Sequence, residues 1–290
     1  MSWRRIALFA IPLAALGVLL GLALVGRSQQ PDGVSIALSP EGTDGGIPLP
    51  PITAARSENA PLVVIDAGHG GRDPGASSAL GGEPESRVTL ALALAVRDAL
   101  AATGRVRVAL TRSDNTYIAL EDRYAIARRL GADLFVSIHA DIAPSNDQAR
   151  GATIYTLSEV ASDREAAALA ERENDANRLG AARMSADPNV NLILIDLAQR
   201  ESMEQAAAFA RLLHREAEPV IPFRPIWHRF AAFIVLKAPD IPSILFEAGY
   251  LSNLQDAADL QSPAGRQRVA EGLRRAIEAF FAGRSVNRAG

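Results

Sequence analysis

The chain has 290 residues, 48% of them hydrophobic, so it can bury a sizeable core and is not disordered as a whole. Its 30 basic and 33 acidic residues give a formal net charge of -3, which creates no global field that would attract nucleic acid, and we expect no nucleic-acid partner. Cysteine is absent, which excludes disulfides, thiolate metal sites and cysteine nucleophiles. Any metal site must therefore use His, Asp or Glu, and the chain has only four histidines.

The amino-terminal segment, residues 1–27, has the pattern of a signal peptide or a transmembrane anchor. Arg4 and Arg5 precede an uncharged apolar run over residues 6–26, which is long enough to cross a bilayer as a helix. A cleaved signal peptide usually has a shorter apolar core, which favours an uncleaved anchor in the inner membrane. The arginine pair is compatible with twin-arginine as well as general export. Either route predicts a periplasmic location for the rest of the chain.

A stretch rich in proline and glycine, residues 28–59, follows this segment and shows little hydrophobic periodicity. Such a composition predicts a flexible linker. We therefore expect the folded domain to occupy residues 60–283.

Strand and helix patterns alternate along this domain. Runs of apolar, mostly β-branched residues predict strands at residues 62–66, 106–111, 134–139, 151–157, 232–236 and 241–247. Helices are expected at residues 88–102, 117–130, 158–179 and 202–216, and a closing helix should run to residue 281, with Ser262 as its N-cap and Pro263 at its first position. The alternation predicts a single α/β domain with a mainly parallel, roughly six-stranded sheet flanked by helices. Ligands gather at the carboxyl ends of such strands.

Two of the four histidines stand at predicted strand ends. His69 lies in a glycine-rich turn after the first strand, and His139 ends the third. Two imidazoles, one carboxylate and an open position are typical of a catalytic zinc site. Asp73, in the same glycine-rich loop, is a candidate to orient a ligand. His214 and His228 are expected on a solvated helix face and in a loop, outside the site.

The carboxylate ligand should come from an acid near the same edge of the sheet. Glu83 and Glu85 both stand just before the helix that follows the glycine-rich loop. Glu85 falls nearer the first turn, where the helix dipole favours a carboxylate for purely structural reasons as well. Spacing alone does not choose between a ligand and a helix cap.

The last predicted strand ends in Glu247, where an acid has no packing role. It is a candidate general base. Zinc would polarise a scissile carbonyl and acidify water, while Glu247 would carry the proton from the water to the leaving amine. The alternative is a surface acid that caps a helix or forms an ion pair.

Several ordered blocks of the sequence resemble N-acetylmuramoyl-L-alanine amidases of the AmiC-like, Amidase_3 type. The blocks are Val64–Ala76 (VIDAGHGGRDPGA), Leu110–Arg112, Phe135–Ala140, and Val235–Leu245 with Glu247 and Leu251–Asn253. The resemblance implies one zinc ion per chain and hydrolysis of the amide between N-acetylmuramic acid and L-alanine in peptidoglycan, in cell-wall remodelling and daughter-cell separation. It implies His69, Glu85 and His139 as metal ligands. Glu85 is chosen over Glu83 because it stands three residues before the Val88-Thr89-Leu90 helix start.

Residues 158–200 resemble an insertion found in division-associated members of the family. There, a helix from the insertion covers the zinc cleft until a LytM-type activator protein displaces it. The resemblance implies autoinhibition here, with Glu159 as the first candidate to reach the metal because it follows a strand end, and with Glu165, Glu171 and Glu173 as alternatives. A charged, solvated helix is the simpler interpretation.

Two rival functions remain at this point. Another zinc peptidase, such as a carboxypeptidase, would use the same ligand types but would need an arginine or similar anchor for a terminal carboxylate. A non-catalytic wall-binding relative would have no reason to keep all four site residues.

Overall fold

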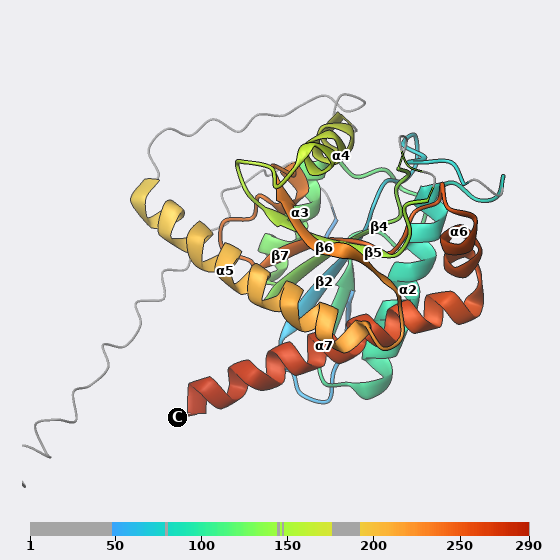
Figure 1. Ribbon diagram of the computed structural model, residues 1–290. Coiled ribbons are helices and arrows are strands. Elements are labelled where there is room, and N and C mark those ends of the chain that lie inside the picture. Colours follow the sequence, from blue (N-terminus) through green and yellow to red (C-terminus); the bar gives the residue numbers. More distant parts are fainter. Residues whose placement is uncertain (1–47, 79–80, 144–145, 147, 176–191, 290) are drawn as a thin grey trace, which may run out of the picture. The chain divides into compact units, whose positions relative to one another are not determined.

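The computed structural model describes residues 48–78, 81–143, 146, 148–175 and 192–289 (Figure 1). The predicted signal or anchor segment, residues 1–27, lies outside these ranges, as do residues 28–47 of the predicted linker. No helix within the described ranges combines the length and the hydropathy needed to cross a membrane.

Seven strands form one mixed sheet. They are β1 (Ile52–Thr53), β2 (Leu62–Ala67), β3 (Arg107–Leu110), β4 (Leu134–His139), β5 (Ala152–Leu157), β6 (Phe223–Ala231) and β7 (Ser243–Glu247). Their order is β1-β3-β2-β4-β7-β5-β6. The pairings from β3 through β2 and β4 to β7 are parallel, as is β5 with β6, whereas β1 is antiparallel to β3 and β5 to β7. The sheet is mainly parallel, as predicted, and the two-residue strand β1 adds a seventh strand from within residues 28–59.

Helices cover both faces of the sheet (Figure 1). One face packs on α2 (Glu85–Thr103), α5 (Leu192–Ala217), α6 (Leu254–Gln261) and α7 (Pro263–Ala289). The other face packs on α3 (Leu120–Leu130), α4 (Arg164–Asp175) and the 3-10 turn η2 (Ile234–Leu236). The domain is thus a sandwich of three layers with two hydrophobic cores, which matches the predicted α/β class.

The strands divide their side chains between the two cores because successive residues of a strand point to opposite faces. In β7, Ile244 and Phe246 enter the core under α5 and α7, whereas Leu245 enters the core under α3 and α4. Glu247 has the parity of Leu245. Its side chain therefore belongs to the face that α4 covers.

The strand predicted at residues 232–236 is wrong. The sixth strand is β6, which ends at Ala231, and residues 234–236 form η2. β6 is an edge strand with several exposed residues, so its apolar pattern is weak and the more apolar stretch after it was mistaken for the strand. His228 consequently lies in a strand rather than a loop.

Helix positions follow the predictions with shifted ends. α2 begins at Glu85, three residues before the predicted start, and α5 begins at Leu192, ten residues before Ser202. The start of α7 is confirmed, since the Ser262 hydroxyl accepts a hydrogen bond from the Gly265 amide at 2.9 Å, as an N-cap does. α6 was not predicted. Of the helix expected at residues 158–179, the described part is α4.

Candidate metal and catalytic site

Parallel pairing brings three strand ends to one edge of the sheet. β2 and β7 flank β4, and His139 pairs in register with Glu247. His69 lies two residues beyond the end of β2, whose Ala67 pairs with Ile138. The edge predicted to hold ligands therefore holds both histidines and the candidate base.

The two histidines converge on the carboxylate of Glu85. The distance from His69 Nε2 to Glu85 Oε2 is 3.2 Å, and that from His139 Nδ1 to Glu85 Oε1 is 3.3 Å. Both imidazole nitrogens are buried and have no hydrogen-bond partner among the described residues. Buried polar atoms rarely lack a partner, so this set of two nitrogens and one carboxylate fits a metal ion. Glu83, the alternative, is exposed and pairs with Arg87.

A fourth side chain reaches this point from α4. Glu173 Oε2 lies 3.1 Å from His139 Nδ1 and 3.6 Å from His69 Nε2. Ligand atoms of these three buried residues lie within 4.8 Å of one another and could hold a metal ion. Of the acids considered in the insertion, Glu159 and Glu171 are exposed. The structure therefore places Glu173, one of the alternatives, at the histidines in place of Glu159, the first candidate.

Little space remains at the histidines while Glu173 is there. The cavity lined by the two histidines and Glu173 measures about 10 Å³. A single water requires roughly 10–15 Å³ measured in this way. The two histidines, both buried, are therefore enclosed in this conformation.

The loop that carries His69 is held by side chains on both sides. Asp73 Oδ2 lies 2.9 Å from His69 Nδ1, the orienting contact expected from the sequence. A Cβ atom on Gly68 would lie 2.5 Å from His139 Nε2. On Gly75, which has a φ of +67°, a Cβ would lie 2.7 Å from His69 Cδ2 and 2.8 Å from Glu85 Oε2. The close approach of the ligands thus requires glycine at both positions.

Glu247 is fully buried beside this cluster. Its Oε2 accepts a hydrogen bond from the Asp141 amide at 3.0 Å, and its Oε1 has no partner among the described residues. Burial, and then repulsion from Asp141, Glu85 and Glu173, raise the pKa of Glu247 well above its usual value. A carboxylate with a raised pKa and a free oxygen is suited to accept a proton and return it.

The carboxylates and histidines of the cluster shift one another's pKa values in opposite directions. Burial alone would lower the pKa of His69, but the charges of Glu85 and Glu173 raise it well above the usual value. Burial alone would raise the pKa of Glu85, but His69 and His139 lower it well below the usual range. Burial raises the pKa of Glu173, with the histidines opposing this. Of the two carboxylates, Glu85 is the one whose charged form the histidines favour more strongly.

Comparison with known proteins agrees with this geometry. A family model described as N-acetylmuramoyl-L-alanine amidase, Amidase_3, matches residues 63–279. The N-acetylmuramoyl-L-alanine amidase AmiA of Escherichia coli K12 is 36% identical over 230 residues, which cover 79% of this chain and 78% of AmiA. The chain belongs to the Amidase_3 family. The resemblance seen in the sequence blocks is thereby confirmed, and the chain is an N-acetylmuramoyl-L-alanine amidase.

Solved structures share the fold of this amidase. The catalytic domain of CwlV, an N-acetylmuramoyl-L-alanine amidase from Paenibacillus polymyxa, is 28% identical with a TM-score of 0.57, over 77% of this chain and 98% of the CwlV domain. Ami1 from Mycobacterium smegmatis is 25% identical, also with a TM-score of 0.57, over 78% of this chain and all of Ami1 (100%). The matched part is the α/β domain.

Two buried arginines hold the glycine-rich loop that carries His69. Sequence patterns alone did not indicate this role for either of them. Arg123 pairs with Asp66 at 2.9 Å and donates to the carbonyls of Ala67 and His69 at 2.7 and 2.9 Å. Arg112 donates to the Gly68 carbonyl at 2.7 Å. These bonds hold a loop in which His69 has a φ of +60°, an unfavourable value for a residue other than glycine. The helix pattern around Arg123 gives no sign of this contact.

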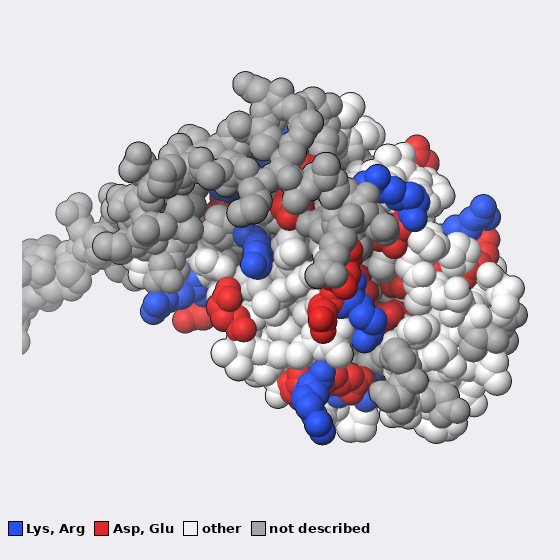
Figure 2. Space-filling view, turned by 90° about the horizontal axis from the view of Figure 1, so that it is seen from above, with Lys and Arg blue, Asp and Glu red and all other residues white. Residues whose placement is uncertain are grey.

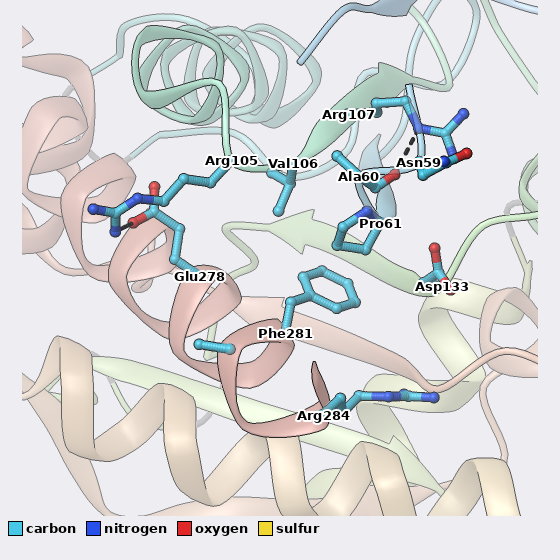
Figure 3. Close-up of a pocket in the computed structure, with 11 residues that line it drawn as sticks. Asn59, Ala60, Pro61, Arg105, Val106, Arg107, Asp133, Glu278, Phe281 and Arg284 are labelled. Carbon is cyan, nitrogen blue, oxygen red and sulfur yellow. Dashed lines mark hydrogen bonds and ion pairs between the residues drawn. The ribbon is translucent and has the colours of Figure 1, made fainter. Parts of the chain in front are cut away.

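A large cavity of the domain lies away from the site. Figure 3 shows a cavity of about 520 Å³ with Phe281 and Glu278 on one side and Arg107 on another. It borders Pro61 and Val106, which precede β2 and β3, so it lies at the opposite edge of the sheet from the histidines. Among the described residues visible in Figure 2, acidic and basic side chains are interspersed. Neither the cavity nor the charged surface indicates a functional site other than the one at the two histidines.

Proposed function

We propose that this amidase is an exported zinc enzyme that hydrolyses the amide between N-acetylmuramic acid and L-alanine in peptidoglycan. The observation that supports this most directly is the pair of buried, unpartnered imidazole nitrogens that face Glu85 beside Glu247. A metal ion bound between these nitrogens and the Glu85 carboxylate would satisfy both nitrogens. All four site residues are present, which disfavours a non-catalytic relative.

His69 Nε2, His139 Nδ1 and the Glu85 carboxylate would hold the zinc ion. Two imidazoles and one carboxylate form a donor set that zinc hydrolases use. Zinc, when bound, supplies Lewis acidity that polarises the scissile carbonyl and eases deprotonation of water. With Nδ1–H directed at Asp73, His69 would present Nε2 to the metal ion.

Glu247 would act as the general base and then the general acid. Its free Oε1 takes the proton of the attacking water and delivers it to the amine of L-alanine as the amide bond breaks. The Asp141 amide holds the other oxygen, which orients the carboxylate. The raised pKa keeps the proton available for the second transfer.

The conformation in the structure fits an autoinhibited enzyme. Glu173 occupies the space in front of the histidines, and α4 is anchored on the sheet by the buried side chain of Leu169. Asn174 donates to the Ala232 carbonyl and accepts from the Ile234 amide, each at 2.9 Å, and Arg172 pairs with Asp141. A LytM-type activator that pulled α4 away would remove Glu173 from the site. Residues 176–191 of the insertion lie outside the described residues.

Export and cell-division roles complete the proposal. Residues 6–26 would carry the chain across the inner membrane and retain it there as an anchor, with the catalytic domain in the periplasm. A chain that is closed until activated suits cell-wall remodelling at daughter-cell separation, where cleavage has to be limited to one place and time.

The test uses the full chain with zinc and purified peptidoglycan. We compare the wild type, Glu173→Ala, and Glu173→Ala combined with Glu247→Gln. New L-alanine amino termini should form faster with Glu173→Ala than with the wild type and should disappear in the double variant, while each protein binds one zinc. Release of free D-alanine in place of L-alanine amino termini would favour a carboxypeptidase. A chain that binds no zinc would refute the proposed site.

A further inference from the structure

A second acid of α4 also occupies a prepared position. Glu165 lies eight residues before Glu173, and its carboxylate lies between two arginines of β6. Arg229 Nη1 lies 2.8 Å from Glu165 Oε2, and Arg224 contacts both carboxylate oxygens, one of them at 3.3 Å. Two guanidinium groups that converge on one carboxylate form a typical recognition geometry for that group.

The arginines belong to the sheet, whereas the acids that neutralise them belong to the α4 segment. The side chain of Arg229 is only 5% exposed and that of Arg224 13%, but that of Glu165 is 45% exposed. The other acid at Arg229 is Asp163, at 3.3 Å, which directly precedes α4. Buried Arg229 Nε has no hydrogen-bond partner among the described residues. Displacement of α4 would take Glu165 away from both arginines, which would then be free to bind another carboxylate.

The arginine pair and the proposed base share one face of the sheet. Glu247 pairs in register with Thr153, and Tyr155 pairs with Arg229. Paired residues, and residues two apart on a strand, point to the same face. The Cα atoms of Glu247 and Arg229 are therefore separated by two strands and two residues, roughly 12 Å. That is the reach of three to four extended residues.

A hollow borders neighbours of both places. A cavity of about 490 Å³ is lined by Asp141, whose amide binds Glu247, and by Glu165, which contacts both arginines. Tyr155 and Tyr250 also line it, and Arg224 donates to the Tyr250 hydroxyl at 3.0 Å. A peptide carboxylate that took the place of Glu165 beside this hollow would meet the two arginines.

We propose that Arg224 and Arg229 form a subsite for a free carboxylate of the peptidoglycan stem peptide, and that Glu165 fills this subsite while α4 is in place. This inference rests on the proposed amidase function of the site. The stem offers two sources of such a group, the α-carboxylate left free by a γ-linked D-glutamate and the carboxyl terminus. α4 would then carry one acid for each part of the site, Glu173 for the histidines and Glu165 for the arginines.

Binding of the product peptide tests the subsite without depending on catalysis. The probe is the synthetic peptide L-alanyl-γ-D-glutamyl-L-lysyl-D-alanine, in which these two groups are the only carboxylates. It is titrated calorimetrically into the full chain with both groups free, with the glutamyl group amidated, or with the terminus amidated. We expect Glu165→Gln to strengthen binding about tenfold, since it removes the internal competitor. Glu171→Gln, an exposed acid of the same helix, is the matched control and should change nothing.

Amidation of the carboxylate that enters the subsite should weaken binding to the Glu165→Gln protein at least about tenfold. The peptide that loses affinity therefore shows whether this is the glutamyl carboxylate or the carboxyl terminus. Arg224→Gln should cause the same loss and abolish the difference between the free and amidated peptides. If Arg224→Gln fails to fold, Arg229→Lys is tested in the same way, since it keeps the positive charge at the more buried of the two positions. Equal binding of all three peptides, or no gain from Glu165→Gln, would overturn the proposal. The binding assay cleaves no bond and so does not depend on catalysis. A protein that binds the peptides in this pattern but hydrolyses no peptidoglycan would refute the proposed function and leave the proposed subsite intact.

Discussion

Replacement of Gly75 by alanine should damage the metal site by a mechanism that can be separated from backbone strain. Gly75 has a φ of +67°, and an added Cβ would lie 2.7 Å from His69 Cδ2 and 2.8 Å from Glu85 Oε2. Gly131, the C-cap of α3, has nearly the same φ, +65°, but a Cβ there would meet nothing within 4 Å. Gly131→Ala is therefore a control for the left-handed backbone alone.

The expected magnitudes differ because only one of the two sites is crowded. The left-handed conformation of an alanine costs roughly 1–2 kcal/mol, so Gly131→Ala should lower the free energy of unfolding by about that amount. Overpacking at Gly75 adds about 1–3 kcal/mol, which gives a total loss of roughly 2–5 kcal/mol. Neither Glu85 nor His69 can move freely, since the Glu85 carboxylate also accepts bonds from the Ala76 and Ala140 amides. Their displacement should weaken zinc binding about tenfold or more.

Urea denaturation of the two chelator-treated variants measures the free energies, and competition with a chromogenic chelator measures zinc affinity. Gly131→Ala should bind zinc like the wild type. If Gly75→Ala lost no more stability than Gly131→Ala and bound zinc normally, the cluster would not be packed as described.

Three further predictions concern the closed state, the base and the loop support. Glu173→Ala should raise hydrolysis of purified peptidoglycan by the full chain several-fold, whereas Glu171→Ala, on the exposed side of α4, should not. Because folding raises the pKa of Glu247, the folded protein binds more protons than the unfolded chain above the usual glutamate pKa, so stability from this residue falls as pH rises through that window. Glu247→Gln should then make the chelator-treated protein more stable in urea at pH 7 than the wild type, with a smaller difference at pH 4; no change with pH would contradict a buried Glu247. Arg123→Met should cost about 3–5 kcal/mol in urea denaturation by leaving Asp66 buried without its partner, and a double variant with Asp66→Asn should recover part of the loss.

Local patterns in the sequence were sufficient for the fold class and most strands. The apolar run that forms β2 is buried throughout, and the histidines were expected at strand ends for the right reason, since buried parallel strands leave a clear apolar signature. The pattern failed at β6, an edge strand whose burial is irregular and whose pairing with β5 contains a register shift. It also gave no warning of β1, whose two residues are too few to show a period.

The sequence by itself determined which segments become strands and which residues stand at their ends, because these properties depend on neighbours a few positions away. The tertiary structure alone decided which end residues meet. The β4–β7 register sets Glu247 beside His139, and the packing of α4 selects Glu173 over Glu159. It likewise brings Glu165 to the β6 arginines. Such contacts join residues tens of positions apart, and they follow from how the helices and strands pack as whole bodies, which short-range periodicity does not encode.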